Sequence, residues 1–135
     1  MKLQCPCDSG KTYPDCCQIL HEGAQANQAL SLMRSRYSAY AYQKVAYIIQ
    51  TTHPDNPSFL ADSIQWAKEI LIFCQNTQFK KLEIVDYLEG IDESIVTFVA
   101  HLNQNHSNKK LFEKSLFIKL NNQWTYRDAL LIKFK

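Results

Sequence analysis

The sequence predicts an α+β fold in which helices come first and an antiparallel sheet follows. Up to about residue 78, apolar side chains recur every three or four residues, which is the period of a helix. Beyond residue 82, four segments rich in β-branched and aromatic residues alternate with turn residues, which is typical of strands. The chain has 135 residues, enough for one domain and a small appendage.

Three helices are predicted ahead of the sheet. They span residues 24–43, residues 45–51, and residue 57 to residues 75–78. Asn56 is the expected N-cap of the third helix. The expected buried stripe of that helix comprises Leu60, Ile64, Ala67, Leu71 and Cys74. Trp66 lies off the stripe, so we expect it to form a pocket wall or to contact the N-terminal segment. The side chains of Arg34 and Arg36 lie on opposite sides of the apolar stripe of the first helix, and we expect both to be partly solvated.

Four strands are predicted, at residues 82–88, 95–102, 111–120 and 124–134. Turn residues separate them at positions 90–92, 103–108 and 121–122, and such short loops favour antiparallel neighbours. On the third strand, alternation places Glu113, Ser115 and Phe117 on one face. Leu116, Ile118 and Leu120 occupy the other face. Either face can be the one that meets the helices.

The composition is that of an ordinary globular protein, with 46% hydrophobic and 21% charged residues and a net charge of +2. No apolar run approaches the ~20 residues that cross a bilayer, so we expect no membrane association. No apolar segment that could serve as a secretory signal precedes Cys5, which predicts a cytoplasmic location and reduced thiols. A net charge this small gives little support to nucleic-acid binding.

Four of the five cysteines cluster as C-x-C-x8-C-C at Cys5, Cys7, Cys16 and Cys17. Two thiolate pairs on either side of a loop suit one tetrahedral Zn²⁺. Disulfide or redox pairing remains an alternative, although a bridge between the adjacent Cys16 and Cys17 would be strained. His21 would be a fifth donor beside a filled shell. Because four protein ligands leave no open position, we expect a structural zinc and no catalysis at the metal.

This N-terminal stretch resembles the SEC-C zinc motif at the C-terminus of SecA, the bacterial preprotein translocase ATPase. The motif runs C-P-C-G-S-G-K-x-Y-x-x-C-[HC], and Ser9, Gly10, Lys11 and Tyr13 also match it. Asp8 replaces a glycine, which raises the question of an extra carboxylate near the metal. The resemblance implies the four cysteines as zinc ligands, and protein partners such as the export chaperone SecB or the ribosome.

The remainder resembles the YchJ-like family, which joins a SEC-C knuckle to a domain of the nuclear-transport-factor-2-like (NTF2-like) superfamily. The resemblance rests on residues 32–40, Tyr47-Ile48, residues 52–54, residues 96–100 and residues 113–115. It implies a curved sheet wrapped around helices as a cone, with a knuckle at residues 1–22 and the cone at residues 24–135. Members of this superfamily often form homodimers. Residues 124–129 depart from the family's Trp-Tyr-Tyr-x-Asp-Gly, and the second SEC-C motif of some members has no counterpart here.

Cones of this superfamily often hold a pocket between helices and sheet. The polar and aromatic candidates for its lining are Arg36, Tyr40, His53, Trp66, His101, Glu113, Ser115 and Asp128, with Tyr87 and Trp124 as further walls. No nucleophile and base at a recognisable spacing appear among them, so the sequence assigns no catalytic residue.

Three functions follow as hypotheses. The leading one is a non-catalytic zinc protein that contacts protein partners through the knuckle. The second is a small-molecule binder or enzyme that uses the cone. The third is nucleic-acid binding by the knuckle through Lys2, Lys11 and Tyr13.

Overall fold

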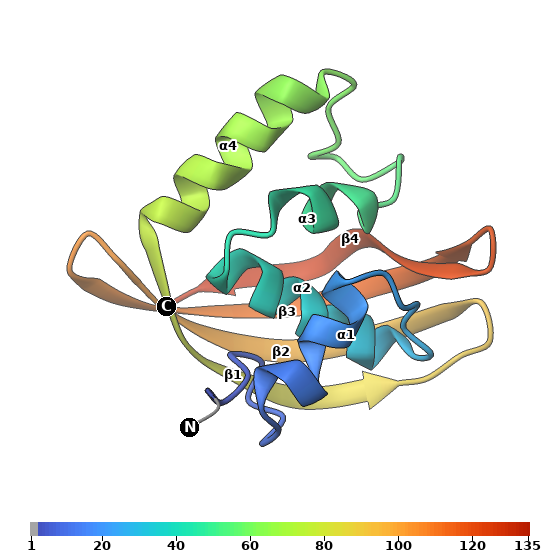
Figure 1. Ribbon diagram of the computed structural model, residues 1–135, viewed down its shortest axis with the longest axis horizontal. Coiled ribbons are helices and arrows are strands. Elements are labelled where there is room, and N and C mark those ends of the chain that lie inside the picture. The colour runs from blue at the N-terminus through green and yellow to red at the C-terminus, as the bar shows by residue number, and fades with distance from the viewer. Residues whose placement is uncertain (1–2) are drawn as a thin grey trace.

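The computed structural model describes residues 3–135 and places four α-helices and a short 3₁₀ turn on one face of a four-stranded antiparallel sheet (Figure 1). The helical elements are η1 (Tyr13–Asp15), α1 (Cys17–His21), α2 (Ala29–Ala41), α3 (Val45–Gln50) and α4 (Ser63–Gln75). The strands are β1 (Thr77–Leu88), β2 (Glu93–Gln104), β3 (Ser107–Leu120) and β4 (Gln123–Phe134). The predicted order of helices followed by strands is confirmed.

The sheet runs β1-β2-β3-β4, and every neighbouring pair is antiparallel. Two hairpins close through two-residue loops, Asn105-His106 and Asn121-Asn122, whose four φ values lie between 51° and 65°. Positive φ at both positions is the signature of type I′ turns, whose twist matches that of the strands. Between β1 and β2, a Cβ on Gly90 would lie 2.1 Å from the carbonyl oxygen of Glu93, so that turn requires glycine.

The helix boundaries differ from the prediction at two places. α2 begins at Ala29, because Gly23 turns the chain at φ +123° and residues 24–28 form a connection. The predicted cap at Asn56 is wrong: its side chain bonds within the loop to the backbone N–H of Ser58 at 2.8 Å. Asp62 caps α4 by accepting hydrogen bonds from two backbone N–H groups of the first turn, each at 3.1 Å.

The predicted stripe of α4 is also wrong in part. Trp66, Ile70 and Cys74 are buried, whereas Ile64 is 71% exposed. These three residues are spaced four apart, and they form a second core with Ala39 of α2 and Ile48 of α3. Cys74 is thus a buried core thiol, as expected. α4 therefore packs on the helical layer and extends away from the sheet (Figure 1).

The main core lies between α2 and the concave face of the sheet. It contains Leu32, Met33 and Tyr37 from α2, and it continues without a break into the cysteine cluster near the N-terminus. No helix within residues 3–135 is long and apolar enough to span a membrane.

Candidate metal centre and cavity

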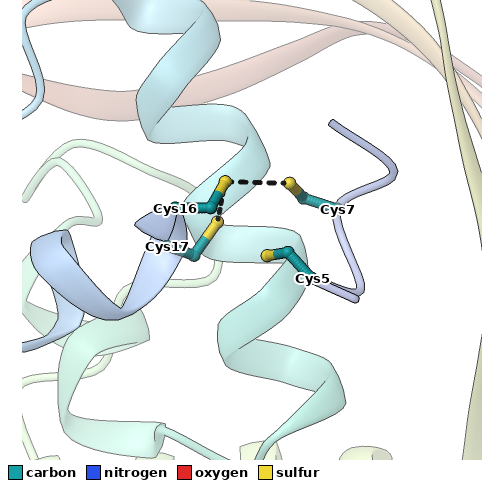
Figure 2. Close-up of side chains that lie close together, drawn as sticks. All are labelled: Cys5, Cys7, Cys16 and Cys17. Carbon is teal, nitrogen blue, oxygen red and sulfur yellow. Dashed lines mark hydrogen bonds between the residues drawn. The ribbon is translucent and has the colours of Figure 1, made fainter. Parts of the chain in front are cut away.

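Four cysteine side chains converge beside α2 (Figure 2). Cys5 and Cys7 come from the N-terminal loop, and Cys16 and Cys17 from the start of α1. Their sulfur atoms all lie within 4.8 Å of one another; Sγ of Cys16 is 3.6 Å from that of Cys7 and 3.9 Å from that of Cys17. A tetrahedral site with Zn–S bonds of ~2.3 Å has S–S edges of about 3.8 Å. The four cysteines are therefore placed to hold a metal ion.

Short backbone contacts fold the loop that carries the first pair. The N–H of Cys5 donates to the carbonyl of Lys11 at 2.9 Å, and the N–H of Tyr13 donates to Leu3 at 3.1 Å. The chain reverses between these contacts through Asp8 at φ 59° and Gly10 at φ +88°. A left-handed backbone is tolerated by aspartate better than by most residues, which explains how Asp8 replaces the glycine of the motif.

The sulfur atoms of the cluster are mostly buried, reduced and in contact with one another. Cys5, Cys7 and Cys17 are at most 3% exposed, and none of the five cysteines, all within the described residues, forms a disulfide. Hydrogen bonds from Cys17 and Cys7 lower the pKa of Cys5, whereas the hydrogen bond with Cys5 raises that of Cys17. Neighbouring thiols thus favour one thiolate at the expense of the others. Ionising all four sulfur atoms this close, and away from water, would need a positive ion between them.

Three residues of α2 hold the knuckle in place: Ser38 and Arg34 through their side chains, and Ser35 through its backbone carbonyl. The hydroxyl of Ser38 lies 3.3 Å from Sγ of Cys5. Arg34 donates from Nη1 to the carbonyl of Cys7. The third contact involves His21, whose Nε2 lies 2.8 Å from the carbonyl oxygen of Ser35 on α2.

His21 is held on both sides of its ring. Its Nδ1 lies 2.7 Å from the hydroxyl of Tyr13, opposite the contact with Ser35. Burial lowers the pKa of His21, with the hydrogen bond to Ser35 acting in the opposite direction. Both ring nitrogen atoms are therefore hydrogen-bonded, and the neutral ring bridges Tyr13 of the knuckle and Ser35 of α2.

Asp8 turns away from the sulfur cluster. Its Oδ2 accepts a hydrogen bond from the backbone N–H of Leu82 on β1 at 2.6 Å. β1 is an edge strand, so this carboxylate satisfies a backbone donor that a neighbouring strand would otherwise take. The carboxylate that distinguishes this chain from the motif thus ties the loop to the sheet.

A cavity of about 180 Å³ lies between α2 and the concave face of the sheet. Four of the predicted pocket residues line it: Arg36, Tyr40, Glu113 and Ser115. The polar face of β3 therefore meets the helices, and its aliphatic face is turned outward. The expectation of a partly solvated Arg36 is wrong, because this side chain is 7% exposed.

Hydroxyl groups surround the buried carboxylate in the cavity. Oε2 of Glu113 accepts from Oγ of Ser115 at 2.5 Å and from the hydroxyl of Tyr126 at 2.8 Å. Burial, followed by the nearby charge of Glu113, raises the pKa of Tyr126. Nη1 of Arg36 lies 2.7–3.1 Å from three neutral acceptors: the carbonyl of Ile48 and the hydroxyls of Thr51 and Thr52.

The other four predicted pocket residues do not line this cavity. Trp66 packs against Phe59 in the second core. His53 lies in the loop after α3, where its Nδ1 accepts from the N–H of Asp55. His101 and Asp128 face outward, because strand alternation separates them from their inward neighbours. His101 contacts Glu83 at 2.5 Å, and Asp128 accepts from the backbone N–H of Ala129.

The further walls suggested by the sequence, Tyr87 and Trp124, belong to the main core but do not line the cavity either. Sequence reasoning missed Tyr126, which contributes both a wall and a donor to Glu113. Counting back from the Asn121-Asn122 turn would have paired it with Phe117, its observed partner on β3.

Of the groups expected to bind nucleic acid, Tyr13 makes contacts within the protein. The ring of Tyr13 packs edge-on against Tyr42 with centroids 4.7 Å apart, and its hydroxyl is bonded to His21. Lys11 is exposed, and Lys2 lies outside the described residues.

Two family models match the chain. One is described as a SEC-C motif and covers residues 1–19. The other is described as "YchJ, middle NTF2-like domain" and covers residues 28–129.

Relatives and solved structures agree with these matches. A UPF0225 protein of Sodalis glossinidius is 35% identical over 96% of this chain and 84% of its own length. A UPF0225 protein of Bordetella pertussis is 39% identical over 93% of this chain and 90% of its own length. The solution structure of a SEC-C motif containing protein from Rhodopseudomonas palustris superposes with a TM-score of 0.80 at 27% identity, covering 98% of this chain and all of that one. The crystal structure of a SEC-C motif containing protein from Psychrobacter arcticus superposes with a TM-score of 0.76 at 27% identity, covering 94% of this chain and 81% of that one. The chain therefore belongs to the YchJ family of UPF0225 proteins, with a SEC-C motif followed by an NTF2-like domain.

Proposed function

We propose that the cysteine cluster holds one structural Zn²⁺ and that the protein is a non-catalytic adaptor whose knuckle contacts a protein partner. The observation that carries the proposal is the closed set of four sulfur atoms within 4.8 Å, three of them on buried residues. A shell of four protein ligands has no open position for water or substrate. The metal then organises the loop and takes no part in a reaction.

Zinc is the proposed metal because soft thiolates and a tetrahedral arrangement suit it. A segment of about 20 residues buries too little apolar surface to fold alone, and metal binding supplies the missing free energy. Reduced thiols suit a reducing compartment, so the cytoplasm is the proposed location.

Exposed apolar side chains on the knuckle support a protein partner. Leu3 is 73% exposed and Ile19 is 51% exposed, while the cysteines beside them are turned into the protein. Zinc-dependent folding would hold both side chains at the surface in a fixed arrangement. The partner surface expected to fit them is apolar. Resemblance to the SecA motif makes the export chaperone SecB and the ribosome the first partners to test.

The zinc proposal is tested by native mass spectrometry of the untagged protein against its denatured mass. We expect one zinc per chain in the wild type and none in Cys17→Ser. Cys74→Ala is the matched control, since it alters a buried thiol outside the cluster and should keep the metal. A wild-type mass without metal, lowered by paired thiols, would refute the proposal.

The partner proposal needs a variant that keeps the metal. Ile19→Ser changes an exposed side chain, so its zinc content and fold should match the wild type. Purified export chaperone and ribosomes are titrated with both proteins, and we expect binding to weaken at least tenfold in the variant. Equal binding by the two zinc-loaded proteins, or no binding by the wild type to either partner, would exclude the adaptor role while leaving the zinc site standing.

A further inference from the structure

We propose that the cavity between α2 and the sheet binds a small uncharged molecule that carries a hydrogen-bond donor beside an acceptor on an aromatic body. A primary amide or a lactam on a single ring has this chemistry. The cavity shares no lining residue with the cysteine cluster, and binding there needs neither the metal nor a protein partner.

The size and walls of the cavity fit one ring and a small head group. Its volume is about 180 Å³, and an apolar cavity of about 150 Å³ in another protein holds benzene. Most of the lining is aromatic or aliphatic: Met33, Tyr37, Tyr40, Phe73, Phe79, Phe98, Ala100, Leu102, Leu111 and Phe117. Such walls favour an apolar body and offer edges and faces for an aromatic ring.

Glu113 presents an unused acceptor. The residue is 7% exposed, and both of its hydroxyl partners bond to Oε2. Oε1 makes no hydrogen bond to any residue between 3 and 135. Oε1 is not among the fully buried atoms that lack a partner, so it is accessible from the cavity that Glu113 lines, and a donor on a ligand can bond to it there.

Arg36 presents unused donors. Only Nη1 is engaged, and its three acceptors are all neutral. Nε and Nη2 have no hydrogen-bond acceptor among the described residues, although the side chain is 7% exposed and lines the cavity. The guanidinium is also held over the ring of Tyr126, with Cζ 4.9 Å from its centroid. An acceptor on a ligand would complete its bonding.

The charges of these two residues determine the charge of the ligand. Within the described part of the chain Arg36 and Glu113 form no direct ion pair, so one formal positive and one formal negative charge face the same cavity. These two formal charges cancel, so a charged head group would leave a net charge in surroundings of low dielectric. A neutral group with adjacent donor and acceptor meets both needs and leaves the charge balanced.

The proposal is tested with four probes of similar size: benzamide, benzoate, benzylamine and toluene. Each is titrated into ¹⁵N-labelled zinc-loaded protein and followed by NMR. We expect benzamide to bind with a dissociation constant on the order of 1 mM or tighter, given its few atoms. Backbone signals of Ser115 and Tyr126 should shift to saturation, while that of the outward-facing His101 should not. The other three probes should bind at least tenfold more weakly.

A charge-switch variant sharpens the test. Glu113→Gln keeps the shape of the side chain and leaves Arg36 as the only charged residue among the described ones that line the cavity, so benzoate should overtake benzamide. Glu83→Gln is the matched control on the outward face of β1, and it should keep the wild-type order. The proposal is overturned if wild-type benzamide shifts do not saturate, as for a cavity that holds water only, or if a charged probe binds best. It is likewise overturned if a folded Glu113→Gln protein keeps the wild-type order. The wild-type ranking decides alone should that variant not fold.

Discussion

Replacing Cys17 by serine is expected to release the knuckle from α2 while the sheet stays folded. Cys17 is 2% exposed, and its sulfur lies inside the cluster that closes the N-terminal loop. Without the metal site the loop is no longer held in one conformation, so the hydrogen bonds that dock it are expected to be lost together. These bonds join Cys5 to Ser38, Arg34 to Cys7, His21 to Ser35 and Leu82 to Asp8.

The size of the effect follows from these four contacts. At about 0.5–1.5 kcal/mol each, their loss lowers the free energy of unfolding by roughly 2–6 kcal/mol. Domains of this size are stable by about 5–15 kcal/mol, so the remainder should still fold. Residues 3–22 would no longer unfold with the rest, and since the urea m-value scales with exposed surface, it should fall by roughly 15%.

Urea unfolding of zinc-loaded wild type and of Cys17→Ser, followed by circular dichroism and tryptophan fluorescence, measures both quantities. Hydrogen exchange should show fast exchange confined to the knuckle in the variant. Cys74→Ala provides the control, since it should keep both the metal and the wild-type m-value. A Cys17→Ser protein with unchanged m-value and a free energy of unfolding within about 0.5 kcal/mol of the wild type would refute the docking argument, because loss of a buried network costs more.

Three further predictions concern the helical layer. Asp62→Ala removes the cap of α4 and should lower the free energy of unfolding by about 1 kcal/mol in urea titrations. Ile48→Ala empties a site that is 1% exposed and should cost about 2–5 kcal/mol, whereas Ile64→Ala should stay within about 0.5 kcal/mol. Because burial lowers the pKa of His21, its stabilising contribution is complete above the unfolded pKa of about 6.5 and is lost as pH falls below it. The melting temperature of the wild type should therefore exceed that of His21→Gln at pH 7.5 by more than at pH 5.5.

Each of these three has a result that contradicts it. Equal stability of Asp62→Ala and wild type would mean that α4 does not depend on its cap. A similar cost for Ile48→Ala and Ile64→Ala would mean that burial does not distinguish the two sites. A difference between wild type and His21→Gln that grows on acidification would mean that the folded protein favours the protonated ring.

The sequence by itself determined features that depend on neighbouring residues. The change of period from helix to strand set the order of the elements. Asn121 and Asn122 both adopt positive φ, which favours a two-residue type I′ turn. Such a turn sets the pairing of β3 with β4 next to it. The cysteine spacing brought together four sulfur atoms because all of them lie on one short loop and the turn after it. The match to the SEC-C and YchJ patterns then predicted the family and the NTF2-like fold.

Only the tertiary structure decided which faces are covered. Alternation on β3 offers two faces, and packing of α2 on the sheet selected the one with Glu113. Register shifts near Ser115 and Phe117 place Ile132, not Leu130, opposite Glu113, and counting from the turn cannot reveal such bulges. The buried face of α4, the burial of Arg36 and the contact of Asp8 with Leu82 depend likewise on distant residues. Local rules fix what each segment can become, whereas burial is shared between segments that meet only after folding.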